Sequence, residues 1–202
     1  MMSEFLTFVQ LGFRHIVNPE ALDHILFLLA LAAIYRGRDW RDSVWVISAF
    51  TVGHSITLAL AATHLVMIPQ AITEFLIPLT IVATGVENIL VRSRHRRSAA
   101  GRCRPVFAGV FGLVHGAGFA GYLQQLFSGS IVVPLFGFNC GIELGQLLVL
   151  SVAGAGLLAL DRTLCQVRLL RLTSSPYRLR VVTVSVLVIV VAARMAIARE
   201  PW

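Results

Sequence analysis

Long apolar stretches, separated by short arginine-rich segments, are the feature that most constrains this chain. Hydrophobic residues make up 57% of its 202 residues, and charged residues make up only 13%. A helix needs about 20 apolar residues to cross the hydrocarbon core of a bilayer, and several stretches here are of that order. We therefore expect an all-α polytopic membrane protein of about six transmembrane helices, forming a single domain over residues 1–202.

The apolar stretches and the prolines between them give approximate helix boundaries. We expect a short N-terminal helix over residues 4–14 to be interfacial or re-entrant, because its apolar residues fall at helical spacing. Asn18 suits an N-cap and Pro19 suits a first helical position, so the next helix should begin there. The expected spanning helices cover six ranges: 19–35, 42–63, 69–91, 105–127, 131–160 and 180–198.

The positions of the basic residues predict the topology. All seventeen are arginines, and fourteen fall in the connections 36–41, 92–104 and 162–180. The alternate connections, 64–68 and 128–130, have none. Because basic residues are retained on the cytoplasmic side, we expect both termini outside. No segment interleaves aromatic and basic residues as nucleic-acid-binding modules do, so the net charge of +7 indicates lipid and not nucleic acid as the partner.

Two stripes of small residues predict close contacts between helices. One comprises Ala108, Gly112, Gly116 and Ala120, and the other comprises Gly137, Gly141 and Gly145. Such stripes let helix backbones approach closely in lipid. They leave open whether helices of separate copies also associate.

Ionisable side chains are unusually frequent within the apolar stretches. Each costs about 2.5–3.5 kcal/mol at membrane depth, so such groups pair with one another, line water or bind a ligand. For any one of them, a hydrogen bond between helices is a sufficient explanation. Five of them, however, come from four expected helices: Asp23, His24, His54, His115 and Glu143. Imidazole with carboxylate is a ligand set for Ni²⁺, Co²⁺ or Zn²⁺, and no cysteine or methionine cluster favours Cu⁺.

These residues predict a metal site in two parts. Asp23 and His24 should form an antechamber near the outer face, and His54, His115 and Glu143 should meet at the core. Asn139 and Gln146 share the face of Glu143, at i, i+4 and i+7 spacing, and extend the polar surface. Further polar residues lie near the two ends of the helix expected over 69–91, with Glu74 at its outer end and Glu87 and Asn88 at its inner end. We expect them to continue a polar pathway.

At these residues the chain resembles the HupE/UreJ family of bacterial hydrogenase and urease accessory membrane proteins. The resemblance is carried, in the family's order, by "GFRHIVNPEALDHILFLLAL", "FTVGHSITLAL", "VENIL", "FGLVHGAGFAGYL" and "FNCGIELGQ". It implies a permease for nickel or cobalt in the bacterial inner membrane. It also implies that His15 joins the five residues above in metal handling. The family usually places five residues, with a glycine, between this histidine and the Asp-His pair. Here seven residues intervene, "IVNPEAL", which predicts a displacement of His15 by a turn or more.

Two other functions use the same residues. An intramembrane metal-dependent hydrolase would bind a catalytic metal through the histidines and a carboxylate, with Glu143 or Glu74 as general base. No HExxH motif supports it. A b-type haem protein would use His54 and His115 as axial ligands from facing helices, but its carboxylates would then have no role.

Overall fold

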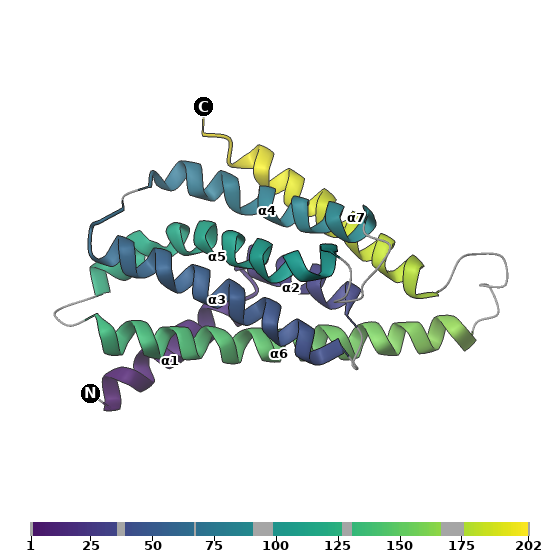
Figure 1. Cartoon of the computed structure of the whole chain (residues 1–202), viewed down its shortest axis with the longest axis horizontal. Coiled ribbons are helices and arrows are strands. Elements are labelled where there is room, and N and C mark those ends of the chain that lie inside the picture. Colours follow the sequence, from purple (N-terminus) through teal and green to yellow (C-terminus); the bar gives the residue numbers. More distant parts are fainter. Residues whose placement is uncertain are drawn as a thin grey trace.

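The computed structural model is a bundle of helices (Figure 1) and describes residues 2–35, 39–66, 68–90, 99–126, 131–166 and 176–201. These residues contain seven helices and no strand. The helices are α1 (Met2–Val17), α2 (Leu22–Ile34), α3 (Trp40–Ala62), α4 (Gln70–Leu90), α5 (Ala99–Leu126), α6 (Val132–Gln166) and α7 (Pro176–Ala198).

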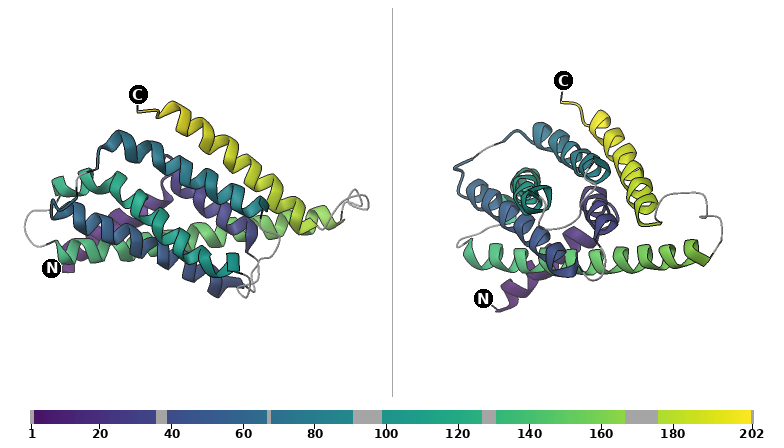
Figure 2. Two further views of the ribbon diagram at one scale, coloured as in Figure 1. Left: turned by 45° about the horizontal axis from the view of Figure 1, so that its top comes forward. Right: turned by 45° about the vertical axis from the view of Figure 1, so that its right-hand side comes forward.

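The helices pack mainly as three pairs around α2. Helix α1 lies along α6, α3 lies along α5, and α4 lies along α7. Helix α2 contacts α4, α6 and α7 and occupies the middle of the bundle, as the second view of Figure 2 shows. Nine of its thirteen residues are buried, which is expected of a helix that is apolar on all sides.

Glycines bring two of these pairs into backbone contact. Between α1 and α6, a Cβ added at Gly12 would overlap the carbonyl of Phe138, and one added at Gly141 would overlap the carbonyl of Val9. Between α3 and α5, a Cβ at Gly112 would overlap the carbonyl of Phe50. The small-residue stripes predicted on 105–127 and 131–160 are thus confirmed as packing surfaces within the chain.

The chain is a multi-pass membrane protein. Among the described residues, α3, α4, α6 and α7 are each long and apolar enough to cross a bilayer. Helix α2 has 13 residues and is about 20 Å long, too short to span alone. Helices α1 and α2 are bent by 70° relative to each other and together make either a broken span or a re-entrant segment. A re-entrant segment is one of the two forms that the sequence predicts for the N-terminal helix. The described residues therefore contain four candidate membrane spans, or five if α1 and α2 make one span, where about six were expected. Helix α5, whose 28 residues include many glycines, is not among these spans.

Several expected helix boundaries require correction. Helix α1 continues to Val17, so the helix expected at 19–35 begins at Leu22 instead. Pro105, expected to open a helix, lies inside α5, which begins six residues earlier. Helix α6 extends to Gln166, beyond the expected end at residue 160. Pro176 opens α7, four residues before the expected start, and takes the first helical position that suits a residue without an N–H.

Helices α3 to α7 run alternately between two ends of the bundle (Figure 1). The starts of α3, α5 and α7 and the end of α6 lie at one end and carry Arg41, Arg104, Arg162, Arg178 and Arg180. This arrangement agrees with the arginine-based topology, and we call this end the arginine end. Residues 36–38, 92–98 and 167–175 of those connections lie outside the described residues.

The glycine contacts predict unequal effects of one substitution at two positions of α6. Gly141→Ala forces a Cβ against the Val9 carbonyl of α1, whereas a Cβ at Gly154 has nothing within 4 Å. Overpacking of this kind costs about 1–3 kcal/mol. We therefore expect Gly141→Ala to lower the thermal midpoint of the detergent-solubilised protein by several degrees, and Gly154→Ala to leave it unchanged or higher. Equal midpoints for the two variants would contradict the α1–α6 packing.

Candidate metal site

The break between α1 and α2 brings two histidines together. Asn18 N–H still bonds Arg14 O at 3.0 Å, but the chain then turns, with Ala21 N–H bonding Asn18 O at 2.9 Å. Asn18 Oδ1 accepts the N–H of Glu20 at 3.1 Å, so this residue stabilises the turn and does not cap a helix at Pro19 as expected. The turn places the last turn of α1 against the first turn of α2.

His15 and His24 face each other across this turn. Their ring centroids lie 4.7 Å apart, at 70° to each other. The seven residues between His15 and Asp23, whose number predicted a displaced His15, include the turn at residues 18–21. This turn brings the ring of His15 to that of His24. His15 also packs on Phe119 of α5, with centroids 4.1 Å apart.

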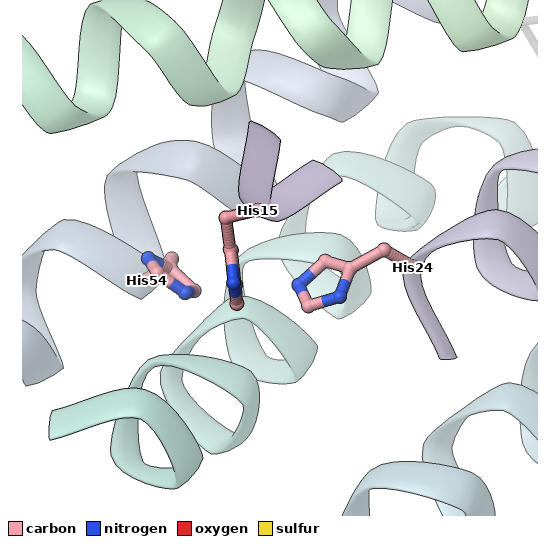
Figure 3. A group of neighbouring side chains, drawn as sticks. All are labelled: His15, His24 and His54. Atoms are coloured by element: carbon pink, nitrogen blue, oxygen red, sulfur yellow. The ribbon is translucent and has the colours of Figure 1, made fainter. Parts of the chain in front are cut away.

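His54 of α3 completes a group of three imidazoles. One ring nitrogen from each of His15, His24 and His54 lies within 4.8 Å of the others. The ring of His15 lies between the other two (Figure 3), and its centroid is 6.3 Å from that of His54. His54 is fully buried and His24 is 6% exposed. We call these three residues the histidine trio.

The trio retains ring nitrogens that bond nothing within the described part of the chain. Nε2 of His15, Nε2 of His24 and both ring nitrogens of His54 are buried without a hydrogen-bond partner. Leaving a buried polar atom unsatisfied costs about 1–3 kcal/mol, so several together call for a ligand. Three convergent imidazole nitrogens fit a late divalent transition metal, because neutral imidazole is among its preferred ligands.

Asp23 orients one member of the trio. Its Oδ1 accepts hydrogen bonds from Nδ1 of His24 and from the backbone N–H of His24, both at 2.9 Å. An ionised carboxylate can only accept, so Nδ1 carries the proton and Nε2 keeps its lone pair. This is the arrangement in which a histidine binds a metal through Nε2.

His115 of α5 lies beside the trio. Its ring centroid is 5.4 Å from that of His24, and its side chain is 2% exposed. Its Nε2 lies 3.1 Å from Thr80 Oγ1 of α4, and its Nδ1 is buried without a partner. His115 therefore adds a fourth imidazole to this region, although its ligand atoms are outside the 4.8 Å group.

A cavity of about 240 Å³ opens onto His15, His24 and His115. We call it the histidine chamber, and it is lined by His15, Asp23, His24, Glu74, Ile77, His115, Gly118, Phe119 and Arg199. Glu74 lies in the first turn and a half of α4, and Arg199 follows the last residue of α7. Both belong to the end of the bundle opposite the arginine end.

Glu143, expected beside His54 and His115, is hydrogen-bonded to α3. Its Oε1 accepts the hydroxyl proton of Ser48 at 2.5 Å, and it is not part of the trio. Gln146, 1% exposed, accepts the hydroxyl proton of Thr51 at 3.0 Å. Asn139 Oδ1 is buried without a partner. Two residues of the polar face predicted on this helix, Glu143 and Gln146, are therefore bonded to α3, and the expected approach of Glu143 to His54 and His115 stays a prediction.

A second, smaller cavity of about 30 Å³ lies toward the arginine end. We call it the Glu87 cavity, and it is lined by Phe27, Leu31, Val46, Thr84, Glu87, Asn88, Arg104, Phe107, Ala108 and Phe111. Glu87 pairs with Arg104 at 2.9 Å, and Asn88 donates its amide to Ala30 O at 2.8 Å. Glu87 and Asn88 were expected on the pathway, but the partner Arg104 was counted only as a topology determinant.

Two aromatic rings lie between the chamber and the Glu87 cavity. Phe27 and Phe50 stack with centroids 4.9 Å apart. The His115 centroid lies 6.2 Å from that of Phe27 and 5.0 Å from that of Phe50. We call Phe27 and Phe50 the aromatic pair. Sequence reasoning missed this pair, because phenylalanines in apolar helices give no signal of their own.

The packing of α3 on α5 excludes the haem alternative. A Cβ at Gly112 would lie 3.0 Å from the backbone nitrogen of His54, and one at Gly116 would overlap the carbonyl of His54. The backbones of α3 and α5 are therefore in contact at His54, and no porphyrin fits between His54 and His115.

The comparison with known families agrees with this geometry. The family model described as HupE / UreJ protein matches residues 1–199. The chain belongs to the HupE/UreJ family. No similar curated protein and no similar solved structure was found. In this HupE/UreJ protein, the quoted motifs contain all three residues of the histidine trio together with Asp23, His115 and Glu143, and "VENIL" supplies Glu87 and Asn88.

The contact between Asp23 and His24 predicts the effect of removing one charge. Asp23→Asn keeps the size of the side chain and an acceptor oxygen but removes the negative charge beside His24. Loss of such an orienting carboxylate weakens metal affinity by about 10–100-fold. Titration of the purified protein with Ni²⁺ in competition with a chromophoric chelator measures this change. Glu20→Gln, the same change at an exposed position of the turn, should bind as the parent does. Parent-like affinity of Asp23→Asn would reduce Asp23 to a local cap.

Proposed function

We propose that this protein is a membrane permease for Ni²⁺ or a similar divalent transition metal ion such as Co²⁺. The observation that carries the proposal is the histidine trio, whose nitrogens converge within 4.8 Å and are buried without partners. Imidazole ligands select late transition ions over Mg²⁺ and Ca²⁺, which prefer oxygen. Membership of the HupE/UreJ family supports nickel or cobalt as the ion.

The ion would enter from the outer side of the bacterial inner membrane. If the arginine end is cytoplasmic, the histidine chamber opens outward. Asp23 and Glu74 supply negative charge in the chamber, His15 and His24 supply imidazole nitrogens there, and His54 lies next to His15. A permease must bind its ion loosely enough to release it, so a site without a full set of anionic ligands suits transport.

The onward route would pass the aromatic pair. His115 lines the chamber, whereas Phe27 lines the Glu87 cavity and lies against His115. Beyond Phe27, Thr84, Glu87 and Asn88 offer oxygen ligands toward the arginine end. The two cavities are separate in this structure, so passage requires the Phe27 side chain to move.

Transport can be measured in proteoliposomes that contain a metal-sensitive fluorophore. We expect His54→Ala to lower the initial rate of Ni²⁺ uptake by at least about tenfold, since one of three ligands is lost. His64→Ala is the matched control, because His64 is exposed in the connection between α3 and α4. A thermal midpoint near that of the parent establishes that the variant is folded. Parent-like uptake by the folded His54→Ala variant would contradict the proposal, as would a parent protein that binds Ni²⁺ without moving it.

The aromatic pair gives a second prediction for the same assay. Phe27→Ala removes the ring between the two cavities, and we expect faster Ni²⁺ uptake with unchanged affinity at the histidine trio. Truncation of a buried Phe costs about 3–5 kcal/mol of stability, so a control with a similar cost is needed. Leu28→Ala provides it, because Leu28 is 1% exposed on the same helix and lines neither cavity. Faster uptake in both variants would indicate a general leak.

A further inference from the structure

Within the described part of the chain, the side chain of His115 makes one hydrogen bond, and its direction follows from the other contact of its partner, Thr80. Thr80 Oγ1 lies 2.7 Å from Ile77 O and 3.1 Å from His115 Nε2. A carbonyl oxygen only accepts, so the hydroxyl proton of Thr80 goes to Ile77. Toward His115 the same oxygen can then only accept, and Nε2 of His115 must carry a proton.

This assigns the opposite nitrogen of His115 as a metal ligand. A neutral imidazole has one N–H and one lone pair, so a protonated Nε2 leaves the lone pair on Nδ1. Nδ1 is buried and has no hydrogen-bond partner, and His115 lines the histidine chamber. His24 has the reverse arrangement, with Nδ1 bonded to Asp23 and Nε2 free. The two neighbouring rings are thus held in opposite tautomers, and each keeps one unpartnered nitrogen.

We infer that Thr80 is a positioning residue that fixes the Nε2–H tautomer of His115 and thereby makes its Nδ1 the fourth imidazole nitrogen available to the ion. This inference rests on the proposed function and deepens it. His115 lies between the trio and Phe27, so it is placed to receive the ion from His24 before the aromatic pair. A fourth neutral nitrogen favours the same late divalent ions without adding charge.

The position of Thr80 on α4 supports this role. Glu74 and Ile77 of α4 line the histidine chamber, and Thr84, Glu87 and Asn88 of α4 line the Glu87 cavity. Thr80 lies between these two groups in sequence, and its hydroxyl is hydrogen-bonded to a side chain of another helix. The hydroxyl of Thr73, two turns earlier, is bonded to Gln70 O within α4, just as the hydroxyl of Thr80 is bonded to Ile77 O. Thr73 and Thr80 thus make the same bond within one helix, and of these two only Thr80 is also hydrogen-bonded to a histidine.

The test compares three variants of the full-length protein in detergent. Thr80→Val removes the hydroxyl and nearly keeps the shape, Thr80→Ser keeps the hydroxyl, and Thr73→Val repeats the first change at a buried position of α4 that lines neither cavity. Ni²⁺ affinity is measured by chelator competition. The tautomer of His115 is measured by ¹⁵N NMR of histidine-labelled protein, with His115→Ala used to assign its signals.

We expect Thr80→Val to lower Ni²⁺ affinity by about 10–100-fold and to remove the pure Nε2–H pattern of His115. Thr80→Ser and Thr73→Val should match the parent in both measurements. Parent-like affinity of Thr80→Val would overturn the inference, as would an equal loss in Thr73→Val or an Nδ1–H tautomer in the parent. If the parent binds Ni²⁺ without transporting it, the proposed function fails while these measurements still decide the role of Thr80. A parent without any Ni²⁺ binding overturns both.

Discussion

Backbone contact at glycines is the interaction on which the rest of this structure depends. Gly112 and Gly116 press α5 onto α3 at His54, and Gly141 and Gly145 press α6 onto α1 beside Phe13 and Ile16. These contacts fix the turn of α3 that carries His54 and the turn of α1 that carries Ile16, the residue next to His15. In lipid, helices are not driven together by exclusion of water, so close packing of this kind must supply the association energy. The same glycines therefore set how closely α3, which carries His54, lies on α5, and how closely α1, which carries His15, lies on α6.

The histidines in and beside the chamber destabilise the fold when no ligand is bound, because several of their buried ring nitrogens have no hydrogen-bond partner among the described residues. Buried ring nitrogens without partners lie in the trio and on His115, at a cost of about 1–3 kcal/mol each when unsatisfied. A core built for packing alone would use apolar residues or complete the hydrogen bonds, as Thr51 of α3 and Gln146 of α6 do. We call this pair, together with Ser48 and Glu143, the α3–α6 seam. An ion that accepts those lone pairs recovers part of this free energy. The chamber thus has the energetic character of a binding site, whereas the seam has that of a structural contact.

The sequence was sufficient for the helical membrane fold, for the packing stripes and for most of the residues around the chamber. Apolar length, glycine spacing and the rarity of ionisable groups in lipid are local signals, and each can be read without coordinates. The partners of those groups could not be obtained in this way. Spacing along one helix defines a face but not the residues that cover it, so the bond from Ser48 of α3 to Glu143 could not be predicted.

The turn at residues 18–21 illustrates the same limit. Asn18 and Pro19 fit a helix start as well as they fit a turn, so these residues alone do not decide between the two. The difference matters for the site, because the turn brings the ring of His15 to that of His24. Thr80 lies at the opposite extreme, since a threonine in an apolar helix usually bonds its own backbone. A series of polar residues at positions 73, 80, 84 and 88 of one α4 face was the only signal.

Helix α4 is the element that joins these features into one route. It borders both cavities and holds His115 through Thr80, yet it meets α5 through side chains. At Gly118 of α5, an added Cβ would meet the side chain of Ile77, whereas Gly112 and Gly116 meet the backbone of α3. Side chains can change rotamer where backbones in contact cannot separate without loss of packing. In the proposed transport cycle, the trio and the α3–α5 pair therefore form the fixed part, and the α4 side of the route is where the two cavities can be connected.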